Sequence, residues 1–370
     1  MEGKISDFME KKLIVALSGG VDSAVAAAFL REAGHDVHGV YMKNWINEEE
    51  ILGDCPWQQD IRDAEAVAAT LGIGFEVVNF MRDYRERVVD YLVRGYASGL
   101  TPNPDVMCNR EMKFGVLLDW ARERGFEGVA TGHYCQSRPG NPGRPYPGPV
   151  ELWEGADKNK DQSYFLALLR PEQLAAAWFP VGHLEKPALR AEARRFGLPN
   201  AEKKDSQGIC FIGRVRINDF LEHFIPPSPG PIVNLAGEVL GEHKGLHRYT
   251  LGQRRGIGLP SNSNFNHYVV VAKDLPANKL VVAFEKERPA ALWQDDARLH
   301  HLSWLTPQPP TEPVDLLCKV RYRDPSVRVR FEPDSTGARL VFAEPQRGLA
   351  SGQVAALYDG ERLLGGGVYV

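Results

Sequence analysis

The sequence predicts an α/β fold for the first part of the chain and mostly β structure for the rest. Strand-like apolar runs alternate with helical patterns from residue 13 to residue 131, which is typical of a parallel sheet covered on both faces. The segment IPPSPGP at 225–231 breaks this pattern, and short strands separated by turns follow it. This rhythm of short strands near the C-terminus indicates a small β-barrel.

The alternating part opens with the continuous apolar run LIVAL at 13–17, whose length and composition suit a strand buried on both faces. Apolar residues at helical spacing then alternate with short strand-like runs, and Gly34 and Gly72 stop the first two helices. We expect helices over 24–33, 61–71, 84–96 and 113–124, and strands over 37–42, 75–80 and 128–131.

A proline- and glycine-rich stretch at 138–149 reads as a surface loop, since it holds five prolines and three glycines in twelve residues. Helical patterns return at 171–178 and 187–196, and short β segments with glycine-rich turns fill 231–284. After a second proline-rich break, at 306–313, the sequence predicts strands over 314–322, 327–331, 339–343, 353–358 and 362–370.

Composition places the 370-residue chain among ordinary globular proteins, with 43% hydrophobic and 25% charged residues. No apolar run approaches the ~20 residues of a membrane span, and the first twelve residues resemble neither a secretory signal nor a transit peptide. The five cysteines include no CxxC pair, so no zinc or cluster site is predicted. We expect a cytoplasmic protein with reduced thiols, no membrane contact and no all-protein metal site. Because the net charge is −4, any nucleic-acid binding must come from local basic patches.

The most specific local signal is SGGVDS at 18–23, between the first strand and the first helix. Two glycines let the backbone approach a ligand closely, and the helix start offers free N–H groups and the positive end of its dipole. Such a site binds phosphate or pyrophosphate. It is not a Walker A loop, because the Gly-Lys-Ser/Thr ending is missing. The ordinary alternative is a tight turn with a serine helix cap, which a bare Gly-Gly pair would favour.

Two of the five cysteines stand in surroundings that suggest chemistry. Cys108 follows TPNPDVM and, with Arg110 and Lys113 nearby, is predicted to lie just ahead of a helix, where a thiolate is favoured. Cys210 lies in DSQGICFIG, downstream of two lysines. A free cysteine is more often a small buried hydrophobe than a catalyst, and we interpret Cys55, Cys135 and Cys318 in that way.

Several motifs in order resemble the tRNA-specific 2-thiouridylase family of the PP-loop ATP pyrophosphatases. They are ALSGGVDS, TPNPDVMCN, ATGHY, KDQSYFL, DSQGICFIG, TLGQRRGIG, VRYRD and SGQVAALYDGERLLGGG. The resemblance implies ATP-dependent adenylation of the C2 carbonyl oxygen of the wobble uridine, followed by sulfur transfer to form 2-thiouridine with release of AMP and pyrophosphate. It also implies a catalytic PP-loop domain (1–224), a central β-rich tRNA-contacting domain (225–286) and a C-terminal tRNA-binding barrel (287–370).

The resemblance implies a role for individual positions. Cys108 matches the nucleophile, Cys210 the cysteine that carries a transient persulfide, and Asp105 a residue placed to handle a proton on the pyrimidine. The ATP contacts match Ala16, Leu17, Ser18, Gly19, Gly20, Val21, Asp22, Ser23, Met42 and Gly132. The tRNA contacts match Asn103, Pro104, Asp105, His133, Lys160, Asp161, Gln162, Arg321, Tyr322 and Gln353. Without the resemblance, Met42 would be interpreted as a core residue, His133 as a hydrogen-bonded strand-end histidine and Gln353 as a surface glutamine.

The implied chemistry sets further expectations. ATP is a substrate and should arrive with Mg²⁺, which needs few protein ligands when it sits on nucleotide phosphates. The persulfide on Cys210 requires a sulfur-donor protein, either a cysteine desulfurase or a sulfur-relay protein. Its sulfur either attacks C2 directly or is released as hydrosulfide by Cys108, and both routes end in a Cys108–Cys210 disulfide. The two Cα atoms must then lie within about 7 Å, so we expect the Cys210 loop to move or to order.

Two basic stretches support RNA contact independently of the resemblance. Residues 244–255 carry four Lys/Arg, one His and one Tyr without a carboxylate, and residues 319–330 carry five basic residues against Asp324. Basic residues interleaved with aromatic ones suit phosphate contact and base stacking. The ordinary alternative is a solvated basic strand face.

Three other functions stay open from the sequence. Another PP-loop enzyme, such as a synthetase that amidates a small molecule, would need neither a second cysteine nor a basic C-terminal barrel. A two-thiocytidine-type thiolase would need CxxC cluster ligands, which the sequence lacks. A non-enzymatic ATP sensor would leave Asp22, Cys108 and Cys210 without a function. The tRNAs modified, the sulfur donor's identity and the oligomeric state are not predicted.

Overall fold

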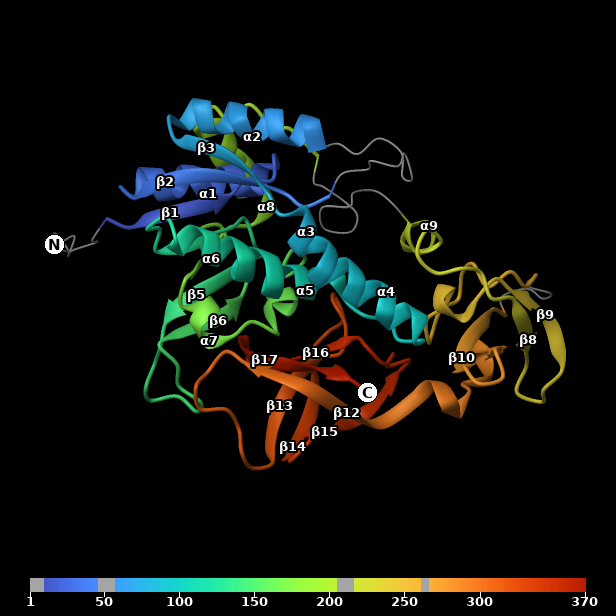
Figure 1. Cartoon of the computed structure of the whole chain (residues 1–370). Helices are drawn as coiled ribbons and strands as arrows, with labels where there is room; N and C mark the ends of the chain where they lie inside the picture. The colour runs from blue at the N-terminus through green and yellow to red at the C-terminus, as the bar shows by residue number, and fades with distance from the viewer. Residues whose placement is uncertain (1–9, 46–56, 205–215, 261–265) are drawn as a thin grey trace.

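A computed structural model describes residues 10–45, 57–204, 216–260 and 266–370. Figure 1 shows a sheet with helices on both faces in the N-terminal part, a β-barrel beside it at the C-terminus, and a smaller β unit beyond the end of α4. This arrangement confirms the predicted fold class.

The N-terminal sheet is parallel and has the strand order β3-β2-β1-β4-β7. Its central strand β1 is buried on both faces, because Leu13 and Val15 pack into one hydrophobic core while Ile14 packs into the other. This explains the unbroken apolar run in the sequence. The strands are β1 Lys12–Ala16, β2 Asp36–Lys43, β3 Gly74–Asn79, β4 Gly128–Ala130 and β7 Ala177–Trp178.

Helices cover the two faces of this sheet in two groups. One group packs with Leu13 and Val15 and comprises α1 Val21–Glu32, α2 Trp57–Leu71 and α8 Lys186–Arg195. The other packs with Ile14 and comprises two long helical stretches that change pitch along their length. These are α3 Met81–Tyr84, η1 Arg85–Val89 and α4 Asp90–Ala97, then α5 Pro104–Met107, η2 Cys108–Val116 and α6 Leu117–Arg122.

The helix expected over 171–178 is only partly present. Helix α7, Pro171–Leu174, ends early, and β7 follows it because Ala177 and Trp178 pair with the exposed edge of β4. The helix expected over 113–124 begins earlier than predicted, since the helical stretch starts at Pro104. Short 3-10 turns complete the helical elements: η3 Ser163–Leu166, η4 Leu246–Arg248, η5 Glu285–Glu287 and η6 Ala290–Leu292.

A four-stranded sheet with the order β10-β11-β8-β9 forms the central unit. It has a separate small core, which includes Ile232, Val270 and Leu280. Helix α9, Ile217–Leu221, precedes it, and its strands are β8 Gly230–Val233, β9 Val239–His243, β10 Tyr268–Asp274 and β11 Lys279–Phe284.

Six antiparallel strands close into the C-terminal barrel, with the order β12-β15-β14-β13-β16-β17 and a closing pair between β12 and β17. The sequence did not predict β12, whose polar run WQDDARLHHLSW buries few of its side chains. The strands are β12 Trp293–Trp304, β13 Val314–Lys319, β14 Val327–Asp334, β15 Gly337–Arg347, β16 Val354–Asp359 and β17 Arg362–Tyr369.

The stretch expected to be a surface loop is the tip of a hairpin that joins the barrel sheet. Strands β5, Cys135–Pro139, and β6, Val150–Glu154, pair with each other, and β6 then pairs with β17. The loop between them is anchored, because its Pro145 carbonyl accepts a hydrogen bond from Arg362 at 2.6 Å. The N-terminal part and the barrel therefore share one sheet.

Helices long and apolar enough to cross a membrane do not occur among the described residues.

Candidate active site

The loop after β1 has the geometry of a tight turn under a neighbouring helix. Gly19 adopts a positive φ of 74°, and a Cβ at this position would lie 2.5 Å from the carbonyl oxygen of Asp60. Only glycine fits both constraints. A Cβ on Gly20 would meet only the Ser18 hydroxyl, at an ordinary 3.4 Å. Gly19 is therefore the more demanding of the two glycines.

The start of α1 presents unbonded backbone N–H groups. Gly20 is the N-cap and provides no side-chain cap, and the first helical hydrogen bond runs from Ala24 N to the Gly20 carbonyl. The Ser23 hydroxyl instead donates to the Gly20 carbonyl and accepts from Ser18 N, which fixes the curve of the loop. The loop therefore joins a strand end to a helix start, with Ala16 ending β1, Leu17 N bonded to the Val40 carbonyl, and Val21 beginning α1. Phosphate binding at this loop stays a prediction.

Asp22 is held by two residues that the sequence did not single out. Its Oδ1 accepts a hydrogen bond from the Tyr134 hydroxyl at 2.8 Å and forms an ion pair with Lys186 Nζ at 2.7 Å. Lys186 is only 12% exposed and stands at the first position of α8, which places a cation beside the start of α1. Tyr134 lies in the quoted ATGHY motif, but no local pattern marked Lys186.

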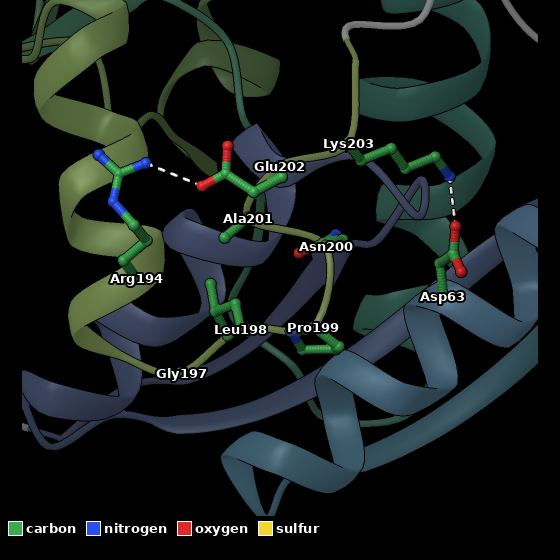
Figure 2. Close-up of a pocket in the computed structure, with 9 residues that line it drawn as sticks. All are labelled: Asp63, Arg194, Gly197, Leu198, Pro199, Asn200, Ala201, Glu202 and Lys203. Atoms are coloured by element: carbon green, nitrogen blue, oxygen red, sulfur yellow. Dashed lines mark hydrogen bonds and ion pairs between the residues drawn. The ribbon is translucent and has the colours of Figure 1, made fainter.

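A second lysine shapes the loop from the other side. Lys203 Nζ bonds the Gly19 carbonyl at 3.2 Å and pairs with Asp60 and Asp63, and Asn200 Nδ2 bonds the same carbonyl at 3.0 Å. Lys203, Asp63 and Asn200 line an open pocket of about 640 Å³. Figure 2 shows these three residues together with the segment that follows α8. From Lys203 the chain runs toward Cys210, which, like Cys55, lies outside the described residues.

Two further predicted ATP positions lie at the carboxyl ends of β2 and β4, the strands on either side of β1. A Cβ on Gly132, after β4, would lie 2.6 Å from the backbone nitrogen of Ser23, so glycine is required for the loop to touch α1. Met42, near the end of β2, has its side chain buried in the same core as Cys108. Any contact between Met42 and a nucleotide must therefore use its backbone.

Cys108 lies within a helical stretch and not ahead of one. Asn103 caps this stretch by accepting hydrogen bonds from Asp105 N and Val106 N, and Pro104 occupies its first turn. Cys108 follows one turn later and is fully buried. Its helix crosses toward the end of β4, where Phe114 lies 6.3 Å from the ring of His133.

Two other cysteines, Cys135 and Cys318, are buried thiols that are not expected to react. Burial, together with the nearby Asp161 carboxylate, raises the pKa of Cys135 well above its usual value. Burial raises the pKa of Cys318 to about 12. Both stay protonated at neutral pH, as expected of small hydrophobic residues.

His133 is a buried, neutral imidazole. Its Nδ1 lies 2.7 Å from the Thr131 hydroxyl, and its ring packs edge-on against Phe179. Burial, reinforced by the charge of Lys113, lowers the pKa of His133 well below its usual value. His133 is therefore uncharged at neutral pH and contributes no positive charge to RNA binding.

The segment before Cys108 meets the other two units at Thr101. Thr101 N donates to the Ser351 carbonyl at 2.8 Å, and its carbonyl accepts from Gln353 Nε2 at 2.6 Å. Its hydroxyl lies 3.4 Å from that of Thr250 in the central unit. Catalytic, central and barrel units thus converge just upstream of Asn103.

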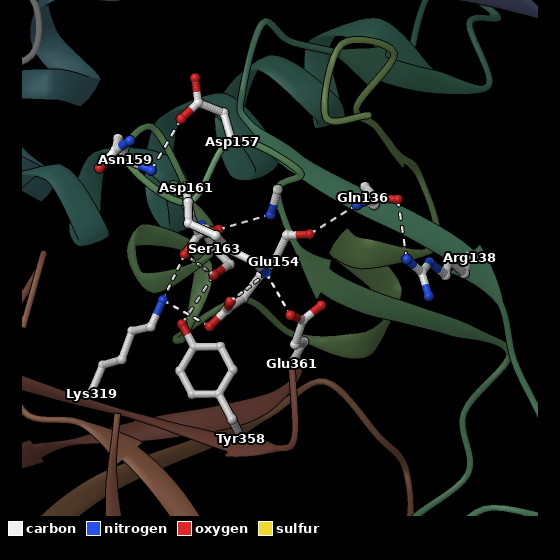
Figure 3. Close-up of polar contacts among 12 residues, drawn as sticks. Gln136, Arg138, Glu154, Asp157, Asn159, Asp161, Ser163, Lys319, Tyr358 and Glu361 are labelled. Atoms are coloured by element: carbon white, nitrogen blue, oxygen red, sulfur yellow. Dashed lines mark hydrogen bonds and ion pairs between the residues drawn. The ribbon is translucent and has the colours of Figure 1, made fainter. Parts of the chain in front are cut away.

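The three neighbouring residues at 160–162, which were predicted to contact tRNA, differ in exposure. Asp161 is buried, accepts hydrogen bonds from Gly155 N and Ser163 N, and pairs with Lys319 Nζ at 2.7 Å. Gln162 bonds to both backbone groups of Tyr134, whereas Lys160 is half-buried. Figure 3 shows Lys319 reaching from the barrel toward Asp161 and Glu154, the two acids with which it pairs and which form the carboxylate cluster. Asp161 therefore joins two domains in the free protein.

The basic residues of the two stretches at 244–255 and 319–330 also differ in exposure: some are bonded within the protein and others face solvent. Lys319 is buried in the cluster, and Arg321 bonds the carbonyls of Arg347 and Gly348, so neither cation is freely presented. Tyr322 packs on Phe165 with ring centroids 4.3 Å apart. The exposed cations of the two stretches are Lys244, Arg254, Arg255, Arg323, Arg328 and Arg330.

Comparison with known proteins gives a match over nearly the whole chain. Family models match as a tRNA methyl transferase HUP domain over 11–214, a tRNA methyl transferase PRC-barrel domain over 218–284 and an aminomethyltransferase beta-barrel domain over 294–369. A tRNA-specific 2-thiouridylase of Akkermansia muciniphila is 51% identical over 97% of this chain and 98% of its own length. Proteins of the same name from Pseudomonas fluorescens and Halalkalibacterium halodurans are each 43% identical, over 98% and 97% of this chain and 96% and 94% of their own lengths.

A solved NMN synthetase from Francisella tularensis is structurally similar over 58% of this chain and 79% of its own. At 17% identity and a TM-score of 0.33, it carries no argument about function.

Proposed function

The chain belongs to the tRNA-specific 2-thiouridylase family, and from that premise we propose that it converts the wobble uridine of tRNA to 2-thiouridine through an adenylated intermediate. The uridine O2 attacks the α-phosphorus of ATP, and pyrophosphate leaves. The oxygen, which is a poor leaving group in uracil, then departs from C2 as part of AMP when sulfur replaces it. This reaction uses ATP and tRNA as substrates.

The loop at 18–23 would bind the phosphates of ATP. Its free N–H groups at the start of α1 face the developing negative charge on pyrophosphate. Lys186 adds a cation next to these groups. Asp22 has a second carboxylate oxygen, Oδ2, that would hold Mg²⁺, since the Tyr134 hydroxyl and Lys186 Nζ both bond to Oδ1 in the part of the chain that the structure describes. Bound Mg²⁺ would neutralise phosphate charge.

Cys108 and Cys210 would perform the sulfur transfer. A donor protein, a desulfurase or a sulfur-relay protein, charges Cys210 with a persulfide, whose terminal sulfur bonds to C2 or is released as hydrosulfide. In both routes the Cys108 thiolate attacks the Cys210 sulfur: the S–S bond of the persulfide breaks, the Cys108–Cys210 disulfide forms, and the outer sulfur leaves with the bonding electron pair, either already attached to C2 or as hydrosulfide that then attacks C2. AMP leaves from C2 when the sulfur adds. Because Cys108 is fully buried in the free protein, its helix start must open to the substrate in this step.

The RNA partner would lie across the barrel, the central unit and the segment 103–105. The exposed cations would meet phosphates, and among them Arg254 would exchange its solvent-exposed pair with Glu285 for a phosphate. Asn103 stands at the start of the helix that carries Cys108. Asp105, one turn ahead of Cys108, is proposed to handle the pyrimidine proton. The compartment that holds tRNA and reduced thiols is the cytoplasm.

One observation carries this proposal most directly. The phosphate loop after β1, Met42 on β2 and Gly132 after β4 all lie at the carboxyl ends of neighbouring parallel strands, where such sheets bind ligands. The buried Cys108 shares a hydrophobic core with Met42 at that edge. This shared core supports a nucleotide and a nucleophile acting in one site.

The test is a reaction of the purified protein with radiolabelled MgATP, unmodified tRNA and a persulfide source. We expect AMP and pyrophosphate to form only when tRNA is present, together with 2-thiouridine detected by nucleoside mass spectrometry. Formation of ADP, or AMP production that ignores tRNA, would contradict the proposal and favour another PP-loop reaction.

A further inference from the structure

The turn between β15 and β16 of the barrel forms hydrogen bonds with the backbone just before the nucleophile helix, the helical stretch that carries Cys108. Both peptide groups of Thr101 are engaged there, with its N–H on the Ser351 carbonyl at 2.8 Å and its carbonyl on Gln353 Nε2 at 2.6 Å. About 250 residues of chain separate the partners of each bond. Thr101 is buried, so these bonds are shielded from competing water.

Close packing supports the two hydrogen bonds. Gly352, between the two barrel partners, has a positive φ of 91°, and a Cβ there would lie 3.0 Å from the Leu100 Cβ and from Thr101 N. Glycine is needed both for the backbone conformation and for the approach. The barrel turn is thus shaped to fit against this one point of the catalytic part.

The link from Thr101 to the nucleophile helix is short and stiff. It consists of Pro102, Asn103 and Pro104, and each proline fixes its own φ near −65° and restricts the residue before it. Asn103 then caps the helix through Asp105 N and Val106 N. A displacement of Thr101 is therefore transmitted to the helix start, one turn before Cys108.

We propose that Gln353 is a positioning residue: through Thr101, the barrel sets the place of the helix that carries Cys108. This inference rests on the proposed function, since it aligns the nucleophile with RNA held by the barrel. The Gln353 Oε1 accepts no hydrogen bond from the described residues, which leaves it for a donor such as a ribose 2′-hydroxyl. One carboxamide then contacts both the RNA and the catalytic segment.

The deciding variant is Gln353→Glu, which keeps the size and the acceptor oxygen but sets a carboxylate against the Thr101 carbonyl. We expect kcat for thiolation to fall by about 10- to 100-fold, because small misplacements of a catalytic group are costly. The dissociation constant for tRNA, measured by filter binding, should change little. Gly352→Ala should give the same pattern while leaving the Gln353 side chain intact. Gln346→Glu, at a half-buried glutamine near the end of β15, is the control and should match the parent protein.

A second readout does not depend on the thiolation reaction. Alkylation of Cys108 by iodoacetamide, followed by peptide mass spectrometry of the free protein, should be slow in the parent protein and about tenfold or more faster in both variants, because local opening exposes a buried group. If the parent makes no 2-thiouridine, the proposed function fails, while the alkylation rates still decide the present inference.

Three results would overturn the inference. A weaker tRNA affinity with unchanged kcat would make Gln353 an RNA contact alone. Unchanged kcat and unchanged Cys108 protection would remove any role in positioning. A large drop in thermal stability that accounts for all the loss of activity in both variants would make the barrel turn a purely structural contact.

Discussion

The loop at 18–23 takes every contact that the structure describes from its own domain, whereas the segment at 101–108 is held by residues of all three units. Asp60, Tyr134 and Lys186 surround the loop, and all lie before residue 204. Thr250 and Gln353 hold the segment, from the central unit and the barrel. We infer that the proposed nucleotide binding depends on the N-terminal domain alone. The position of the Cys108 thiol depends in addition on the two domains proposed to hold RNA.

The largest expected effect is on 2-thiouridine formation, and it should distinguish two buried cysteines of the same hydrophobic core. Cys108→Ser should reduce 2-thiouridine formation by more than about 1000-fold, because a hydroxyl cannot complete sulfur transfer. Cys135→Ser is the matched control, since both thiols are fully buried in the same hydrophobic cluster and should lose similar stability. Nucleoside mass spectrometry measures the product, and tRNA binding should survive in both variants. An active Cys108→Ser protein would rule out the two-cysteine mechanism.

The next effect, on pyrophosphate release, tests whether the loop at 18–23 acts independently of tRNA binding. Gly19→Ala should slow pyrophosphate release by about 100-fold or more, since its Cβ would collide with the Asp60 carbonyl and distort the donors that face the phosphates. Gly125→Ala has a similar positive φ but open space around its Cβ, so it controls for backbone strain alone. Filter binding should show unchanged tRNA affinity in both. A loss of tRNA affinity in Gly19→Ala would break the comparison.

A third prediction concerns the carboxylate cluster between the domains. Lys319→Met should lower the free energy of unfolding by about 3 kcal/mol, because it removes the cation that pairs with the buried Asp161 carboxylate and leaves Glu154 only its pair with the exposed Lys158. Lys11→Met removes an exposed pair with Glu127 and should cost less than about 1 kcal/mol. Urea unfolding measures both. Equal losses would show that the cluster is no stronger than a surface pair.

The same cluster predicts a dependence on pH. Burial alone lowers the pKa of Lys319, but Asp161 and Glu154 outweigh it, and the net pKa is raised above its usual value. The stabilisation is therefore complete below the pKa of an unfolded lysine and is lost as the pH rises through the higher folded pKa. Urea midpoints measured from pH 8 upward should fall more in the parent than in Lys319→Met.

The smallest expected effect is on the salt dependence of tRNA binding. It should differ between an exposed arginine and an arginine whose guanidinium is bonded to backbone carbonyls. Arg254→Ala should flatten the dependence of log Kd for tRNA on log salt by about one unit, if this exposed side chain meets one phosphate. Arg321→Ala should flatten it less and lower the melting temperature, since its guanidinium bonds two backbone carbonyls. Arg82→Ala, an exposed arginine on α3, is the control. Equal slopes for Arg254→Ala and Arg82→Ala would place the RNA elsewhere.

The sequence predicted what is local. Strand β1, helix α1 and the turn between them follow from an apolar run, two glycines and an alanine-rich stretch, and the structure has all three. It did not predict β12 or β7, because a polar strand and a two-residue strand are defined by their partners and not by their own pattern. The hairpin of β5 and β6 was hidden for the same reason.

In the candidate site, too, local features could be predicted from the sequence, whereas contacts between distant residues could not. The phosphate loop could be recognised from consecutive residues, but Lys186 reaches Asp22 from 164 positions away. Asp161 matched a tRNA position, yet its buried pairing with Lys319 depends on a barrel strand 158 positions distant. Such pairings require the tertiary fold, which no spacing in one sequence specifies. The roles of these residues in catalysis and RNA binding remain predictions.

The hairpin shared between the catalytic part and the barrel has a consequence for synthesis. Trp153 and Leu152 on β6 pair with Arg362 and Leu363, close to the end of the chain. A ribosome adds about 5–20 residues per second, so the roughly 200 intervening residues take about 10–40 s to appear. Until then the edge of β6 has no partner and cannot be covered. A prematurely terminated copy never completes this sheet, so the nascent protein is committed to its final shape only when its last strand has been translated.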